Sequence, residues 1–364
     1  MAAAMTSPAT ADATRDEQWH LKYLNIKVAH SVTKGSGITV GVVDTGVSPH
    51  PDLDQNLLDG KDVISDSTGN GKVDEIGHGT AMAGIIAAHG HGKSSGVIGI
   101  APETRILPVK EEKPGFANAG LNIAPGIEYA ASKDVDIINV SLSSAPSLAL
   151  QRAVMDAQKR DILIVAAAGN RPNDFAIGYP AAMPGVLAVG ATDREGKHLP
   201  FSVEDNKVGL CAPGIDIETT YLNRGYATSR GTSDATAIVS GAAALVRAKF
   251  PDLSAQEVIH RLTATATDVG PPGRDEECGY GIVNIVKALT ADVPPLDGAG
   301  ASEPSSSPPA ESSPPAPPQS APEGEAQTSS VNVPAVVGGI VGVLLLGGLI
   351  FSLVVQRRRR RTDR

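Results

Sequence analysis

Cysteine is scarce in this sequence: only Cys211 and Cys278 occur among its 364 residues. Neither cysteine stands at a metal-site spacing from a histidine, which excludes the usual Cys/His metal motifs. An even number of cysteines suggests one disulfide if the protein lies outside the cell, whereas buried free thiols are also common in folded domains. The sequence leaves these two alternatives open.

Positively charged residues are also fewer than negatively charged ones over most of the chain. The formal net charge is −9 at pH 7, and residues 357–364 hold six arginines and one aspartate. This tail therefore carries +5 and the rest of the chain −14. So acidic a chain argues against nucleic acid as a partner.

The first 13 residues are small and polar, and they lack the apolar core of an export signal. The stretch Ala9-Thr10-Ala11-Asp12-Ala13 nevertheless resembles the small-residue end of a signal peptide. We therefore expect residues 1–14 to be a signal-peptide remnant or disordered, with the true start upstream. The alternative is a C-terminal helix that inserts without a signal, which would leave the folded domain in the cytoplasm.

Large apolar residues are almost absent from residues 291–332, which consist mainly of Pro, Ser, Ala, Gly and Glu. Such a composition cannot bury a core, so we predict a disordered linker here and a folded domain over residues 15–290. Residues 333–355 are uncharged and apolar, and long enough to cross a hydrocarbon core of ~30 Å as a transmembrane helix. By the positive-inside rule, the basic tail 356–364 is then cytoplasmic and the folded domain extracellular, in a single-pass plasma-membrane protein.

The folded region alternates short β-rich runs with helix-length segments. The predicted strands cover residues 38–43, 105–109, 135–140, 162–166 and 186–189, and two helices between them are predicted at 124–133 and 147–160. This alternation predicts an α/β fold with a mainly parallel sheet and helices on both faces. In such sheets functional sites lie at the carboxyl ends of the strands, where Asp44 follows the first run.

One stretch places a serine at the start of an apolar helix. Gly231 permits a tight turn, and the run of Ala, Val and Leu after it is typical of a buried helix. The hydroxyl of Ser233 would then lie near the positive end of the helix dipole, where developing anionic charge is stabilised. The alternative is a serine that only caps a core helix, and this stretch alone does not decide between them.

Two further residues supply what a serine nucleophile needs. Asp44 stands at a strand end and His78 at the start of a small apolar helix, each in a loop that contains glycine. His78 would remove the proton of Ser233, and Asp44 would hold the imidazole in the useful tautomer and stabilise its charged form. Their order along the chain, Asp then His then Ser, is that of the subtilisin type of triad.

The surrounding motifs resemble those of the subtilisin-like serine peptidases. They are Val43-Asp44-Thr45-Gly46, Gly77-His78-Gly79-Thr80-Ala81-Met82-Ala83-Gly84, Gly231-Thr232-Ser233-Asp234-Ala235 and Ala166-Ala167-Ala168-Gly169-Asn170. The resemblance spans about residues 19–288 and implies a subtilisin-like fold and peptide hydrolysis through an acyl-enzyme on Ser233, without a cofactor. It also implies that the Asn170 side chain completes the oxyanion hole with the N–H of the nucleophile.

The same resemblance implies a set of substrate-binding residues. Ser141, Leu142 and Ser143 stand where the family pairs with the substrate backbone by strand addition, and Ala167 and Gly169 belong to the segment that leads to the oxyanion hole. Ser143 replaces the usual glycine. Backbone pairing stays possible, and we expect the groove to be narrower.

Two other positions differ from the family pattern. Ala237 occupies a position that is usually proline, at little expected cost because proline is only tolerated early in a helix. No calcium loop is recognisable. Gln18 and Asp52 match two ligand positions loosely, and we expect solvated polar side chains there and no bound metal.

The order of segments gives a finer resemblance. The motif Asp16-Glu17-Gln18-Trp19, a Pro-rich stalk, one C-terminal span and an Arg-rich tail look like the mycosins, membrane-anchored peptidases associated with type VII secretion. This implies a membrane-anchored serine endopeptidase whose partners are a protein or peptide substrate and the secretion complex. The alternative is a scaffold subunit of the secretion machine whose peptidase site is secondary or vestigial.

Overall fold

The computed structural model describes residues 14–92, 95–112, 114 and 122–296. The chain divides into two units, Met1–Ser302 and Glu303–Arg364, and the second lies outside the described residues. The predicted transmembrane segment, the basic tail and most of the predicted linker therefore lie outside them too. Within the described ranges, no helix combines the length and the apolar character needed to cross a membrane.

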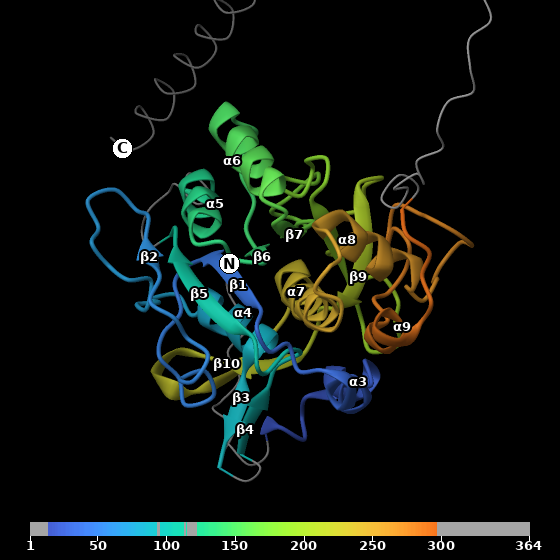
Figure 1. The fold of residues 1–364 in the computed structure, drawn as a ribbon, viewed down its shortest axis with the longest axis horizontal. Helices are drawn as coiled ribbons and strands as arrows, with labels where there is room; N and C mark the ends of the chain where they lie inside the picture. The colour runs from blue at the N-terminus through green and yellow to red at the C-terminus, as the bar shows by residue number, and fades with distance from the viewer. Residues whose placement is uncertain (1–13, 93–94, 113, 115–121, 297–364) are drawn as a thin grey trace, which may run out of the picture. The chain divides into compact units, whose positions relative to one another are not determined.

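A seven-stranded sheet lies at the centre of the first unit (Figure 1). Its strands, in spatial order, are β2 (Lys61–Asp62), β5 (Arg105–Lys110), β1 (Thr39–Asp44), β6 (Ile137–Val140), β7 (Leu163–Ala167), β8 (Leu187–Thr192) and β9 (Val208–Pro213). Every neighbouring pair is parallel. All five predicted strands belong to this sheet, so the predicted parallel sheet is confirmed. The edge strands β2 and β9 are additions that the sequence pattern does not indicate.

Successive side chains of the central strands enter two different apolar layers. In β1, Val42 packs into the layer on one face of the sheet and Val43 into the layer on the other. Because both faces are covered, β1 and β7 are buried along their whole length. This explains why their sequences are continuous runs of apolar residues rather than alternating ones.

Helices cover both faces of the sheet, as the sequence predicts. On one face pack α5 (Ile123–Ser132) and α6 (Leu148–Lys159), and on the other α4 (His78–Ala87) and α7 (Thr232–Lys249) (Figure 1). The described residues also form the helical segments α2 (Trp19–Tyr23), α3 (Ile26–Val32), the 3₁₀ turn Leu222–Arg224, α8 (Ala255–Ala264) and α9 (Ile285–Thr290). Two antiparallel hairpins complete the unit, β3 (His89–His91) with β4 (Ser95–Ile98) and β10 (Ile217–Thr220) with β11 (Tyr226–Ser229).

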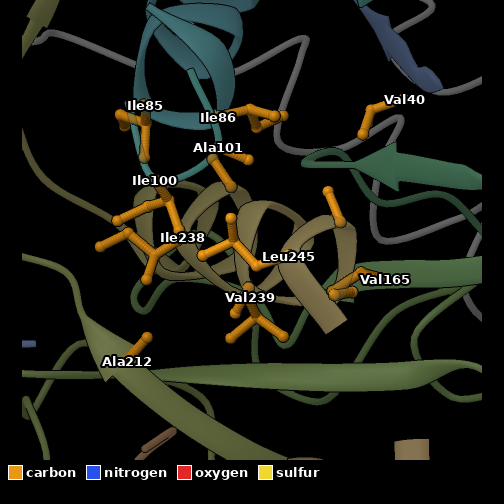
Figure 2. Packing of buried hydrophobic residues seen from close by; sticks show 14 of the residues in the cluster. Val40, Ile85, Ile86, Ile100, Ala101, Val165, Ala212, Ile238, Val239 and Leu245 are labelled. Carbon is orange, nitrogen blue, oxygen red and sulfur yellow. The ribbon is translucent and has the colours of Figure 1, made fainter. Parts of the chain in front are cut away.

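Helix α7 is buried on all sides from Thr232 to Arg247. Figure 2 shows Ile238 and Val239 of α7 between Ile85 of α4 and Ala212 of β9. A helix that is apolar all round belongs in the interior, where its neighbours fix its position. The residues at its start are therefore held firmly against the sheet.

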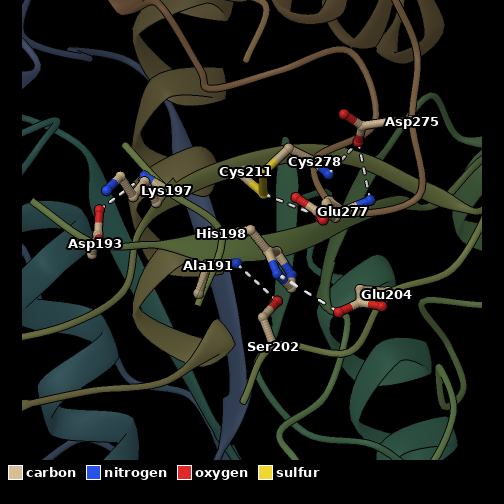
Figure 3. Close-up of a disulfide and its surroundings, with 10 residues drawn as sticks. All are labelled: Ala191, Asp193, Lys197, His198, Ser202, Glu204, Cys211, Asp275, Glu277 and Cys278. Carbon is tan, nitrogen blue, oxygen red and sulfur yellow. Dashed lines mark hydrogen bonds and ion pairs between the residues drawn. A yellow bond between two sulfur atoms is a disulfide. The ribbon is translucent and has the colours of Figure 1, made fainter. Parts of the chain in front are cut away.

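A disulfide joins Cys211 in β9 to Cys278, 67 residues later in the chain (Figure 3). Backbone hydrogen bonds support the same junction: Cys211 N–H donates to the Gly281 carbonyl at 3.0 Å, and Val283 N–H donates to the Cys211 carbonyl at 2.9 Å. The segment after α8 is thus fastened to the edge of the sheet. Of the two alternatives for the cysteines, the disulfide is the one observed.

Candidate active site

The three predicted catalytic residues stand at the ends of three different elements. Asp44 is the last residue of β1, His78 the first of α4 and Ser233 the second of α7. The carboxyl end of a parallel strand and the N-termini of the helices beside it meet at one edge of the sheet. Sequence positions almost 190 residues apart are brought to this edge by the fold.

Asp44 and His78 form a short hydrogen bond, with 2.7 Å between Asp44 Oδ1 and His78 Nδ1. The Asp44 side chain is fully buried, and that of His78 is 22% exposed. The N–H of Thr45 also donates to Asp44 Oδ1, at 2.8 Å, and fixes the carboxylate. Since the carboxylate accepts the proton on Nδ1, Nε2 is the ring nitrogen left to take a proton from a nucleophile.

The loop before His78 is shaped by Gly77 and Asp74. Gly77 has φ 94°, and a Cβ there would lie 2.3 Å from the Tyr221 ring, so only glycine fits. Asp74, which is 6% exposed, accepts the N–H groups of Gly77 and Thr80 at 2.8 and 2.9 Å. It thereby satisfies free donors at the start of α4. An aspartate just before a helix start is a capping signal that the sequence does show. The family motifs do not include this residue.

The pKa of His78 is raised from 6.5 to about 9. Burial disfavours the charged ring, but the negative charge of Asp44 and its hydrogen bond outweigh this effect. The charges of Asp234 and Asp74 raise the pKa further. Because only the neutral ring can accept a proton, the raised pKa gives a strong base that is available toward alkaline pH.

Asp234 directly follows Ser233 and is a buried carboxyl group that sequence reasoning passed over. It is 1% exposed, and Ser229 Oγ donates to its Oδ1 at 2.5 Å. Its Oδ2 is buried without a hydrogen-bond donor in the described part of the chain. Burial raises the pKa of Asp234 to about 7, although the Ser229 hydrogen bond and the charge of His78 lower it. No sequence signal marks this burial, which comes from the packing around α7.

The hydroxyl of Ser233 donates to the carbonyl of Ser141 at 3.2 Å. Among the described residues, no hydrogen bond joins Ser233 to His78. The side chain is 5% exposed and lies on the first turn of α7. Catalytic hydrogen bonds are often long or missing in sites without substrate, so this geometry does not argue against the predicted pair of Ser233 and His78.

Two N–H groups near the start of α7 are candidates for the predicted oxyanion hole. The Asn170 side chain is oriented by its Oδ1, which accepts the Thr232 N–H at 2.9 Å and the Thr232 hydroxyl at 3.3 Å. This leaves its Nδ2 without an acceptor among the described residues. The N–H of Ser233 lies in the first turn of α7 and has no partner within the helix. The use of these two groups as donors to an oxyanion stays a prediction.

The predicted substrate segment leaves the carboxyl end of β6 beside the nucleophile. Ser141 Oγ donates to the Ser233 carbonyl at 3.3 Å, so the two residues contact each other twice. Leu142 is partly buried against the layer of α5 and α6. Ser143 Oγ donates to Asp174 Oδ1 at 3.4 Å, away from the nucleophile.

The other predicted substrate residues lie at the end of β7. Ala167 is 4% exposed, and Gly169 N–H donates to Thr232 Oγ1 at 3.2 Å. Gly169 has φ 112°, and a Cβ there would approach the Asp174 Cβ to 3.0 Å. The two segments thus flank the start of α7, and their contacts with substrate stay a prediction.

One expectation from the sequence is wrong: Gln18 and Asp52 are not solvated. They are 4% and 0% exposed. The Gln18 side chain hydrogen-bonds both the N–H and the carbonyl of Ile98, each at 2.9 Å. Asp52 accepts His91 Nδ1 at 2.5 Å and the Val97 N–H at 2.9 Å. Both side chains are buried because they bind the hairpin of β3 and β4 to the rest of the unit.

Sequence comparison gives the family of the chain. The profile of the Subtilase family matches residues 35–281. Subtilisin Savinase from Lederbergia lenta is 38% identical over 274 residues, which cover 74% of this chain and 97% of that protein. Minor extracellular protease Epr from Bacillus subtilis is 36% identical over 278 residues, 76% of this chain but only 42% of the relative.

Comparison with solved structures agrees with the sequence comparison. The crystal structure of MycP1 from the ESX-1 type VII secretion system matches with a TM-score of 0.69 at 30% identity, covering 80% of this chain and 89% of that one. The fold is therefore the subtilisin-like α/β fold that the motifs imply. The chain belongs to the subtilase family and is a subtilisin-like serine endopeptidase.

Proposed function

We propose that this endopeptidase works through Asp44, His78 and Ser233, that it is anchored in the plasma membrane, and that it processes a protein linked to type VII secretion. The observation that carries the catalytic part is the 2.7 Å hydrogen bond between Asp44 and His78 at the sheet edge where α7 presents Ser233. In this proposal His78 is the general base, Asp44 orients it and Ser233 is the nucleophile.

Catalysis then follows from the geometry. Once substrate enters, Ser233 Oγ leaves the Ser141 carbonyl and attacks the peptide carbon while His78 Nε2 takes its proton. Asp44 stabilises the imidazolium, and the Ser233 N–H and Asn170 Nδ2 stabilise the oxyanion. His78 next protonates the leaving amine, and water releases the acyl group by the reverse sequence. These residues supply every step, so we propose no cofactor.

Hydrolysis of a fluorogenic peptide mixture by the purified full-length chain in detergent tests this proposal. Ser233→Ala should have no activity, and Ser240→Ala, which removes another hydroxyl of α7, should keep it. Ser240 hydrogen-bonds Asn139 inside the core and contacts none of the catalytic groups described above. Equal activity of the Ser233→Ala protein and the wild type would refute the catalytic assignment.

The membrane anchor is supported by the uncharged segment 333–355 and the five consecutive arginines that follow it. The proposed topology is a single-pass protein with an extracellular catalytic domain and a cytoplasmic C-terminus. Protease added to intact cells should release an active fragment cut within residues 291–332. Release only after lysis of the cells would show that the catalytic domain faces the cytoplasm.

The link to type VII secretion is supported by the similarity to MycP1, which is described as part of the ESX-1 type VII secretion system. The rival is a scaffold subunit with a secondary or vestigial site, which the intact catalytic residues argue against. Complementation of a deletion strain separates the two. Secretion restored by wild type but not by Ser233→Ala supports processing, whereas equal rescue supports the scaffold.

A further inference from the structure

Asp174 lies on the loop after Asn170 and is partly buried. Its N–H donates to the Asn170 carbonyl at 3.0 Å, and its Oδ2 accepts the Asn170 N–H at 2.7 Å. Its Oδ1 accepts from Ser143 Oγ at 3.4 Å. One carboxylate therefore bridges the segment that leaves β6 and the segment that leaves β7.

Both bridged segments lie against the start of α7. The first contains Ser141, whose carbonyl accepts from Ser233 Oγ at 3.2 Å, and the second contains Asn170, which accepts the Thr232 N–H at 2.9 Å. A peptide carbonyl positioned for attack must lie against Ser233 and the Asn170 amide. The residue on the acyl side is attached to that carbonyl through its Cα, so its side chain would lie between the two segments. A long side chain in that position would come near the Asp174 carboxylate, which joins the two segments.

Within the described residues, no Lys or Arg neutralises the charge of Asp174. Its two hydrogen-bond donors are neutral groups, and no ion pair joins it to a Lys or Arg of the described ranges. Arg171, the nearest cation along the chain, instead lies 3.9 Å from Glu204. A carboxylate has about four acceptor positions, so roughly two remain open here. Asp174 can therefore accept further, charge-assisted hydrogen bonds from a cation.

We propose that Asp174 selects a lysine or arginine as the residue whose carbonyl is attacked. The inference rests on the proposed peptidase function and adds its substrate class. An arginine can form two parallel hydrogen bonds to one carboxylate, and such bonds to a charged group are about twice as strong as neutral ones. Ser143, which replaces the glycine usual in the family, then acts as a support that holds the carboxylate toward the substrate.

The test uses the full-length chain in detergent and two peptides that differ only at the residue before the cleaved bond. One carries arginine and the other citrulline, its neutral counterpart of nearly the same shape. Wild type should cleave the arginine peptide with a kcat/KM roughly 10- to 100-fold higher. Asp174→Asn should lose this preference through a fall for the arginine peptide alone, and Asp174→Glu, which restores the charge, should keep most of it.

A matched control is Asp193→Asn. Asp193 is also a loop aspartate that accepts two backbone N–H groups, from Glu195 at 3.0 Å and Lys197 at 2.8 Å. The Asp193→Asn substitution should leave the preference for the arginine peptide unchanged. Equal losses for both peptides in Asp174→Asn would show that Asp174 only supports the loop, and the inference would fail.

Labelling with a fluorophosphonate separates this failure from failure of the proposed function. Wild type that is labelled at Ser233 but does not prefer the arginine peptide refutes the selectivity alone. Wild type that is neither labelled nor active refutes the proposed function, and the inference with it.

Discussion

Asp74 accepts a hydrogen bond from the Thr45 hydroxyl at 2.9 Å, which ties the end of β1 to the loop before α4. The same carboxylate accepts the Thr80 hydroxyl at 2.7 Å, and Thr45 Oγ1 in turn accepts the Gly79 N–H at 2.9 Å. Asp44 and His78 belong to different elements, so this network is what holds them in register. The hydrogen bond between Asp44 and His78 is thus flanked by a carboxylate that has no hydrogen bond to the histidine ring.

The first prediction concerns this support. Asp74→Ala leaves several buried donors without an acceptor and should lower the free energy of unfolding by about 2 kcal/mol or more, with a fall in kcat. Urea unfolding and peptide hydrolysis measure the two effects. Asp193→Ala removes a loop aspartate with two backbone donors at exposed positions and should change stability far less. Equal stability of the two variants would count against the network.

The second prediction is an alkaline pH profile. For an uncharged peptide, kcat/KM should rise with pH along a curve whose midpoint lies above 6.5, toward the pKa of about 9 of His78, because only the neutral ring accepts a proton. The stability that the charged ring adds through its acidic neighbours is present below pH 6.5 and is lost as pH rises through about 9.

Asp234→Asn tests the cause of this shift. Removal of a negative charge near His78 makes the imidazolium less favourable, so its pKa falls and the activity curve moves to lower pH. The control Asp193→Asn, on a loop after β8, should leave the midpoint in place. An unchanged midpoint in Asp234→Asn would show that Asp234 does not act on the catalytic base.

The third prediction addresses the oxyanion. Asn170→Ala should lower kcat by about 10²–10³ with little change in KM, the size of effect known for removal of this type of donor from a subtilisin. The amide acts chiefly on the tetrahedral state, which explains why binding is spared. The melting temperature of the variant should be measured as well, because Asn170 Oδ1 also accepts the Thr232 N–H and its loss can affect stability. A rise confined to KM would place Asn170 outside the oxyanion hole.

The fourth prediction concerns the disulfide. Replacement of both Cys211 and Cys278 by serine should lower the free energy of unfolding by about 2–5 kcal/mol. The disulfide joins residues that are 67 positions apart, and without it the unfolded chain between them regains conformational freedom. Activity at 25 °C should persist, since neither cysteine contacts the catalytic groups. Loss of activity in a protein that is still folded would contradict this.

The sequence predicts the centre of the fold well. Buried parallel strands such as β1 and β7 are continuous apolar runs, and the rule that sites gather at strand ends singles out Asp44. Its pairing with His78 follows from the chemistry of a serine nucleophile and from the motifs. The edge strand β9 gives no clear strand pattern in the sequence, because Gly209 and Pro213 interrupt its run of β-forming residues. The two-residue β2 is too short to give a pattern at all.

The supporting residues could not be predicted to the same extent. Asp74 has a local capping signal, but its bond to Thr45 spans 29 positions and depends on how β1 and α4 meet. Asp234 and Asp52 look like ordinary polar residues in the sequence, and only tertiary packing buries them. Burial of a polar side chain depends on partners that are distant in the chain, and a single sequence does not show which partners those are.

The most direct test of the catalytic mechanism is the position of a fluorophosphonate adduct. Peptide mapping by mass spectrometry should find one adduct, on Ser233, and His78→Ala should slow its formation while Ser233→Ala prevents it. Ser233→Ala should melt like the wild type, because the hydroxyl donates only one hydrogen bond, to the Ser141 carbonyl. An adduct on another residue, or labelling and hydrolysis that persist in a folded Ser233→Ala protein, would contradict the mechanism.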